Sequence, residues 1–227
     1  MRESLAWSKM NLQSKLHGLA ETVRQTRGIT PKKNTRTLDK LDRWETELDH
    51  ILEMMRQIEL ELGPALEENL EVNIAQDELL KIAMFQPSTK NLFLEIEAHF
   101  IRDEPSAVDF DSLNELSMVP EMAKVLALMG DAAISMAILH HLWRPSMKEV
   151  GLLTQRRADV VSNENMASLC DEWGLYDYRI HFDPPAEIKS EMQHIKGTLV
   201  EAVYGIIYVR YGFSSVKGNS AHLLSLV

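Results

Sequence analysis

The stretch LALMGDAAI, residues 126–134, places an acidic side chain, Asp131, inside a run of small and apolar residues. Leu126 and Ala133 can line one face of a helix, so Asp131 is expected on or beside a buried face. Gly130 costs such a helix roughly 1 kcal/mol relative to alanine. Because an unpaired buried carboxylate takes up a proton or finds a cation, the stretch predicts a helix in which Asp131 has a specific partner.

A second apolar helix, over residues 187–211, carries an acid in the same kind of surroundings. Glu201 is flanked by Leu199, Val200, Ala202 and Val203. Mg²⁺ prefers oxygen ligands, so two facing carboxylates would suit it. The alternative is that each acid caps a neighbouring helix or pairs with an arginine.

Apolar residues recur at helical spacing along almost the whole chain. The 227 residues contain ten Gly and eight Pro, mostly at the ends of segments, and alternating β-branched residues are rare. The sequence therefore predicts an all-α fold. The expected helices cover residues 38–62, 66–86, 89–102, 111–118, 120–143, 146–162, 163–173 and 187–211.

The helix expected at residues 38–62 has one continuous apolar stripe. Its members follow at alternating spacings of three and four residues: Leu41, Trp44, Leu48, Ile51, Met55, Ile58 and Leu62. Packing within the chain is favoured over a coiled coil between subunits. We expect a basic arm and this helix over residues 1–70, a helical domain over 71–213, and a Ser- and Gly-containing tail over 214–227.

Charge is distributed unevenly along the chain. The net charge of −10 argues against a polyanionic partner, but residues 1–43 carry ten Lys or Arg and only four acids. The single cysteine, Cys170, gives no sign of an oxidising compartment, so a cytoplasmic location is expected. No segment indicates membrane insertion, and no glycine-rich loop indicates a nucleotide cofactor.

Three motifs in a fixed order resemble the endonuclease domain of the ribonuclease III family. The motifs are GDAAI from Gly130, GLLTQRRADVVSNENMASLCDEWGL at 151–175 and IKGTLVEAVYGIIYVRYGF at 195–213. DELLKIAMFQPS at 77–88 is a weaker match to the first helix of that domain. The resemblance covers about residues 71–213, with an apparent insertion around 89–120.

The resemblance implies an all-helical domain that dimerises and cleaves double-stranded RNA with Mg²⁺ held by helix carboxylates. Most relatives offer four acids, and the matching positions here are Ala127, Asp131, Thr198 and Glu201. The compact Mini-ribonuclease III branch lacks the same two acids and is still a nuclease. Asp131 and Glu201 are therefore the predicted catalytic residues and ligands of Mg²⁺, with Mn²⁺ as a substitute. The alternatives are an inactive RNA-binding or scaffold protein and a purely protein-binding module.

Contacts to double-stranded or structured RNA are expected from basic residues in two regions. Within the domain, these are Lys124, where many relatives carry an acid, and Arg156 and Arg157. In the N-terminal arm, they are Arg24, Arg27, Lys32, Lys33 and Arg36, which could grip phosphates across an A-form groove. A solvated, charge-mixed arm is the other interpretation. The expected assembly is a homodimer.

Overall fold

The structure, a computed structural model, describes residues 8–101, 109–146, 149–184 and 187–225. Within these residues every regular element is helical, and one parallel β-bridge joins Phe85 to Ile180. The all-α prediction is confirmed. The helices are α1 (Leu12–Ile29), α2 (Thr35–Gln57), the π-helical η1 (Ile58–Leu62), α3 (Gly63–Leu70), α4 (Glu78–Ala83), α5 (Thr89–Phe100), α6 (Phe110–Leu142), α7 (Val150–Val160), α8 (Asn163–Glu172), the 3₁₀ helix η2 (Leu175–Tyr178), α9 (Lys189–Tyr211), α10 (Phe213–Asn219) and α11 (Ala221–Leu224).

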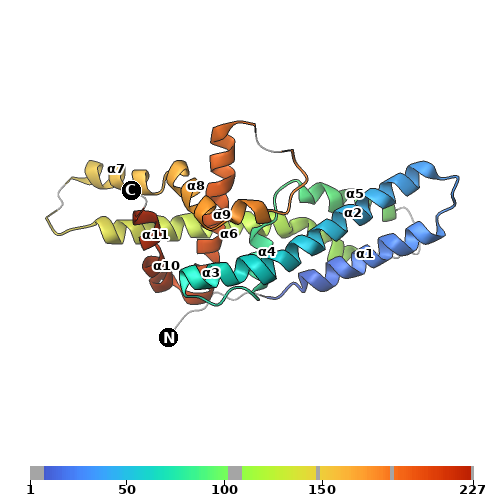
Figure 1. Ribbon diagram of the computed structural model, residues 1–227, viewed down its shortest axis with the longest axis horizontal. Coiled ribbons are helices and arrows are strands. Elements are labelled where there is room, and N and C mark those ends of the chain that lie inside the picture. Colours follow the sequence, from blue (N-terminus) through green and yellow to red (C-terminus); the bar gives the residue numbers. More distant parts are fainter. Residues whose placement is uncertain (1–7, 102–108, 147–148, 185–186, 226–227) are drawn as a thin grey trace.

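Helices α1 and α2 form a hairpin that projects from one end of the elongated molecule (Figure 1). The expected arm is a packed helix from residue 12 onward, because its apolar residues also form a stripe. That stripe is buried against α2 and consists of Leu12, Leu16, Leu19, Ala20 and Val23. All seven residues of the predicted α2 stripe are buried in the same chain, so the prediction of intramolecular packing is confirmed.

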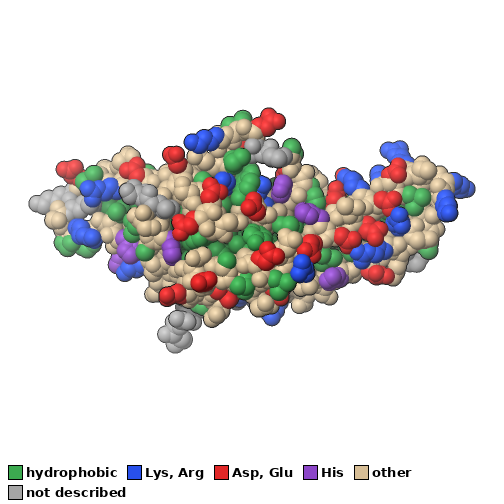
Figure 2. All heavy atoms as spheres, in the orientation of Figure 1, with side chains coloured by type: hydrophobic (Ala, Val, Ile, Leu, Met, Phe, Trp, Pro, Cys, Tyr) green, Lys and Arg blue, Asp and Glu red, His purple; other side chains and the backbone are tan. Residues whose placement is uncertain are grey.

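Lys and Arg side chains gather at the outer end of this hairpin, interleaved with acids (Figure 2). Lys32, Lys33 and Arg36 are exposed at the turn between the two helices. Farther in, the cations bind acids across the hairpin. Positive charge that is free of such pairing is therefore concentrated at the turn.

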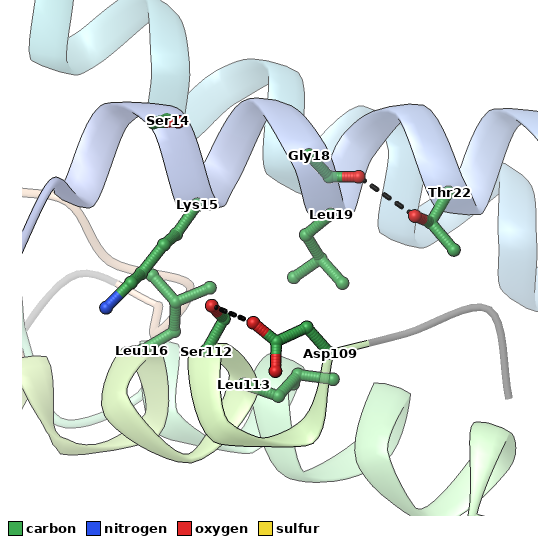
Figure 3. A pocket seen from close by; sticks show the side chains of 9 residues that line it. All are labelled: Ser14, Lys15, Gly18, Leu19, Thr22, Asp109, Ser112, Leu113 and Leu116. Atoms are coloured by element: carbon green, nitrogen blue, oxygen red, sulfur yellow. Dashed lines mark hydrogen bonds between the residues drawn. The ribbon is translucent and has the colours of Figure 1, made fainter.

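The inner half of α1 lies over the first turns of α6 (Figure 3). Asp109 begins α6 by accepting hydrogen bonds from the Asp111 backbone N–H at 3.1 Å and from the Ser112 hydroxyl at 2.6 Å. Lys15 of α1 forms an ion pair with Glu115 of α6. A cavity of about 280 Å³ remains between the two helices.

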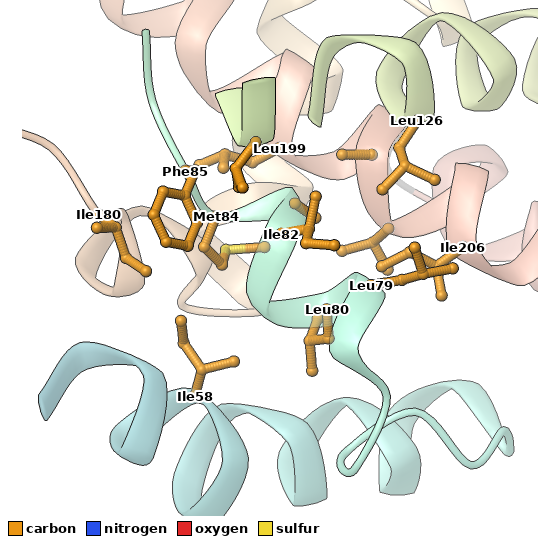
Figure 4. Close-up of a cluster of buried hydrophobic side chains, with 14 of the residues drawn as sticks. Ile58, Leu79, Leu80, Ile82, Met84, Phe85, Leu126, Ile180, Leu199 and Ile206 are labelled. Atoms are coloured by element: carbon orange, nitrogen blue, oxygen red, sulfur yellow. The ribbon is translucent and has the colours of Figure 1, made fainter. Parts of the chain in front are cut away.

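Helix α4 joins the hairpin and the rest of the molecule into one core (Figure 4). Leu80 faces Ile58 of η1, whereas Leu79 and Ile82 lie toward Leu126 of α6 and Ile206 of α9. All six side chains are at most 3% exposed. The described parts of residues 1–70 and 71–213 therefore share an apolar core.

The helix expected at 66–86 is interrupted. Glu71 has a left-handed conformation, with φ 51°, and ends α3. The Asp77 carboxylate accepts a hydrogen bond from the Leu79 N–H at 3.0 Å and begins α4. This carboxylate also binds Arg210 of α9, so the break positions a link between the two helices.

Helix α6 is continuous where two helices were expected. Pro120 lies inside it and is buried, and the helix continues past this residue although proline has no N–H to donate. By length and composition α6 is the one helix among the described residues that could cross a membrane. Here it packs against α4, α5, α9 and α10, which accounts for its apolar character.

The expected tail is also helical in its described part. Helices α10 and α11 pack beside α6, α8 and α9. Val216 and Leu223 are fully buried, and the Asn165 amide donates to the Leu223 carbonyl at 3.1 Å. The two apolar residues are spaced seven apart, which places them on one side of the segment despite its Ser and Gly content.

Candidate active site

Helices α6 and α9 cross at two glycines. A Cβ atom on Gly130 would lie well under 3.0 Å from the carbonyl oxygen of Glu201, and one on Gly205 would lie equally close to the carbonyl of Leu126. Real Cβ atoms essentially never make such contacts. Gly130 weakens the helix, but only a residue without a side chain lets the α6 backbone lie this close to α9.

This crossing brings the two predicted acids to one cavity of about 390 Å³. Asp131 follows Gly130 on α6 and is exposed, whereas Glu201 on α9 is partly buried. Asp131 thus lies on the solvent side of the buried face, beside it rather than on it. The cavity is lined by Ala83, Phe85, Gln86, Pro87, Pro120, Ala123, Lys124, Ala127, Leu128, Asp131, His194, Ile195, Thr198, Leu199, Glu201 and Ala202.

Glu201 is affected by its burial and by the charge of Asp131. Burial, followed by the negative charge of Asp131, raises the pKa of Glu201 to about 7. Among the described residues, neither carboxylate has a hydrogen-bond or ion-pair partner that would lower its energy. The arrangement is therefore one of two close acids without the arginine or helix cap that could have explained each of them.

The carboxylates of Asp131 and Glu201 suit a divalent cation that keeps several water ligands better than a cation coordinated only by protein atoms. Two carboxylates supply oxygen ligands, which Mg²⁺ prefers, and Mg²⁺ commonly keeps several waters. No group of three or more His, Cys, Asp or Glu that could hold a metal occurs in the described part of the chain. At the two positions where the resemblance implies further acids, this chain has Ala127 and Thr198. Ala127 offers no ligand, and the Thr198 hydroxyl donates to the His194 carbonyl at 3.0 Å.

Lys124 lies at the same cavity, one and two turns before Ala127 and Asp131. Its ammonium group is exposed and forms an ion pair with Glu121 at 3.1 Å. An exposed pair of this kind contributes little energy, so the ammonium can be redirected toward a phosphate. Of the basic residues predicted to contact RNA, Lys124 is the one that the structure brings to the two acids.

Arg156 and Arg157 lie on α7, away from the cavity. Arg156 is exposed, and Arg157 donates to the Ser135 hydroxyl at 3.2 Å. The acids considered as partners for them are engaged elsewhere: Asp159 accepts from Gln155, and Asp171 binds Lys196. Helix α7 and the hairpin turn lie at opposite ends of the molecule in Figure 1.

The hairpin cations fall into two groups. Arg24 forms ion pairs with Glu45 and Asp49, and Arg27 forms ion pairs with Asp42 and Glu45 of α2. These pairings explain the raised pKa of both guanidinium groups. Both arginines are engaged by acids of α2 in this chain, and their contact with RNA stays a prediction. Lys32, Lys33 and Arg36 have no such acid among the described residues.

Sequence reasoning missed two polar residues at the cavity, Gln86 and His194. His194 precedes Thr198 by four residues and Glu201 by seven, so the three share one face of α9. That spacing was visible in the sequence and could have identified the histidine. Gln86 comes from the bridge segment before α5, whose position no local pattern indicates.

Residues 124–212 match the family model described as the Ribonuclease III domain. The match contains both acids, both crossing glycines and the whole of α7 and α8. It covers well under half of the 227 residues and leaves α1 to α5 outside. No curated protein matches the chain significantly. Over residues 124–212 the chain is therefore similar to the Ribonuclease III domain, and the N-terminal helical hairpin lies outside the matched residues.

Proposed function

We propose that the chain is a divalent-metal-dependent endoribonuclease that acts on double-stranded or structured RNA, with Asp131 and Glu201 as its two acids. The observation that carries this proposal is the convergence of these unpartnered carboxylates at one cavity of a ribonuclease III domain. An acid pair that served only the fold would be expected to have cationic or hydrogen-bonded partners.

Asp131 and Glu201 would hold Mg²⁺ or Mn²⁺ between α6 and α9, with water completing the coordination. A bound divalent cation supplies charge stabilisation at the scissile phosphate and activation of a water molecule. With such a cation bound, the repulsion between Asp131 and Glu201 would be offset and Glu201 would be ionised at neutral pH. Lys124 would contact a phosphate from the rim of the cavity. The two-acid set resembles that of the Mini-ribonuclease III branch.

A homodimer is part of this proposal. Several apolar side chains on one side of α6 remain exposed in the single chain: Val125 is 55% exposed, Leu128 69% and Met136 58%. Exposed apolar clusters of this kind mark interaction surfaces. A second copy that covers them would place two acid pairs on one assembly, as cleavage of both strands of a duplex requires.

Cleavage of long double-stranded RNA tests the proposal. The wild type should cleave with Mg²⁺ or Mn²⁺ and not with EDTA, whereas Asp131→Asn and Glu201→Gln should each lose at least about a hundredfold in rate because the cation loses one of two direct ligands. Glu172→Gln removes an exposed acid of α8 and serves as the matched control.

Two outcomes would contradict the enzyme proposal. Absence of cleavage at every Mg²⁺ and Mn²⁺ concentration would do so, as would equal cleavage by the wild type and Asp131→Asn. RNA binding that persists without cleavage would favour an inactive RNA-binding or scaffold protein.

A further inference from the structure

The cavity beside the two acids has a mainly apolar interior. Its walls include Phe85, Pro87, Ala123, Ile195 and Leu199, and its volume of about 390 Å³ lies in the range of about 300–1,000 Å³ typical of small-ligand sites. A water-filled cleft that only admits a phosphodiester to the acids would not need such walls. A cavity of this size and lining suits a small group with apolar faces.

Two of the wall positions are those at which four-acid relatives carry carboxylates. Ala127 is 4% exposed and ends at its Cβ atom. The Thr198 hydroxyl is already bonded to the backbone of its own helix. Both side chains are short and uncharged, so they leave space at the cavity wall. The absence of acids at these two positions therefore affects the shape and charge of the cavity as well as the number of metal ligands.

The chemistry of the walls selects among the parts of an RNA chain. A phosphate would be disfavoured in the interior, because the walls there are mainly apolar carbon and Lys124 lies at the exposed rim. A nucleobase is neutral, has apolar faces and carries polar atoms along its edge. Gln86 supplies an amide and Thr198 a hydroxyl oxygen, which can bond such an edge.

We propose that this cavity accepts one unpaired nucleobase of the RNA, adjacent to the phosphodiester that lies at Asp131 and Glu201. This inference rests on the proposed function, because it concerns the substrate of the same site. A paired base is held in the helical stack, whereas a bulged or mismatched base can be splayed out at little cost. The preferred substrate is then a helix with one unpaired nucleotide next to the bond that is cut.

Matched RNA hairpins test this preference. One hairpin is fully paired, one carries a single bulged nucleotide, and one carries an abasic residue at the bulge. The wild type should cleave beside the bulge with kcat/KM at least about tenfold above that for the paired hairpin, because unpairing need not be driven by binding. The abasic hairpin should lose this gain.

Filling the cavity should abolish the selectivity. Ala127→Leu and Thr198→Leu add side-chain volume from two different helices, and each should bring the ratio of bulged to paired cleavage close to one. Ala98→Leu makes the same change as Ala127→Leu at an exposed position of α5 and should leave the ratio unchanged. Thermal unfolding establishes that each variant is folded.

A binding measurement keeps the inference separate from catalysis. 2-Aminopurine at the bulge should be protected from acrylamide quenching when the hairpin binds Asp131→Asn protein, and Ala127→Leu added to that variant should remove the protection. Protection without any cleavage by the wild type would support the cavity and contradict the proposed function. Asp131-dependent cleavage without bulge preference or protection would overturn the inference and leave the proposed function standing.

Discussion

The Cα atom of Gly130 faces the backbone carbonyl of Glu201 at a distance that leaves no room for a side chain. Gly205 makes the reciprocal contact with Leu126, so two glycines on two helices determine how closely α6 and α9 cross. Because Asp131 and Glu201 are adjacent to these contacts, the spacing of the acids depends on the crossing.

Gly130→Ala and Gly205→Ala should each destabilise the protein by several kcal/mol or prevent folding, because the added methyl group meets backbone atoms that cannot move alone. Gly18→Ala is the matched control. Gly18 is an exposed glycine of α1 with no atom within 4 Å of its would-be Cβ, so alanine there should stabilise by about 0.5–1 kcal/mol. Urea unfolding measures the free energy of unfolding of the three variants. Equal changes in this free energy at the three positions would contradict the tight crossing.

The metal-free protein should lose stability as the pH rises through the titration of Glu201. The folded-state pKa of about 7 lies above the usual value of 4.5. The contribution of protonated Glu201 to the free energy of unfolding is therefore complete below about pH 4.5 and is lost by about pH 7. The loss is at most about 3 kcal/mol, and contact of the carboxyl with water at the cavity reduces it.

Glu201→Gln should remove this part of the pH dependence, and Asp131→Asn should weaken it, because Asp131 is the second cause of the raised pKa. Denaturant unfolding in EDTA at several pH values provides the measurement. A wild type and a Glu201→Gln variant with parallel stability curves would show that the carboxyl titrates normally.

The hairpin turn should contribute to RNA affinity without sequence preference. Changing Lys32, Lys33 and Arg36 together to Gln should weaken binding to all duplexes and make the dependence of log affinity on log salt less steep by about one per lost phosphate contact. Changing Arg56, Lys90 and Lys217 to Gln removes the same charge elsewhere. If the two triple variants bind alike, the turn has no specific role.

The exposed apolar side of α6 should be the contact between subunits. Val125→Glu and Met136→Glu should shift a wild-type dimer to monomer in sedimentation velocity, because each charge would be buried in the contact. Leu60→Glu, at a position of η1 that is 56% exposed, is the control. A wild type that sediments as a monomer at all concentrations would exclude the homodimer.

How much could be predicted from sequence depends on whether a feature is local. The stripe from Leu41 to Leu62 repeats at helical spacing, so its burial followed directly. Asp131 and Glu201 were found because each interrupts an apolar helix and because the order of motifs resembles that of a known domain. The same spacing was present in residues 12–23, but the many charges between the apolar positions favoured an arm.

Other features depend on contacts between distant segments. The pairing of Arg24 with Glu45 and Asp49 needs the hairpin turn, which residue types alone do not specify. The cavity beside Ala127 and Thr198 exists only because α4, α6 and α9 meet there. The prediction placed a break between residues 118 and 120, whereas the packing of α6 against its neighbours favours one continuous helix.

The most direct test of the account is Mn²⁺ binding followed by electron paramagnetic resonance at neutral pH. The wild type and Glu172→Gln should bind one Mn²⁺ per chain, Mg²⁺ should displace it, and Asp131→Asn and Glu201→Gln should each lose it. If the wild type binds no Mn²⁺, or if both acid variants bind it as well as the wild type does, Asp131 and Glu201 do not share a cation.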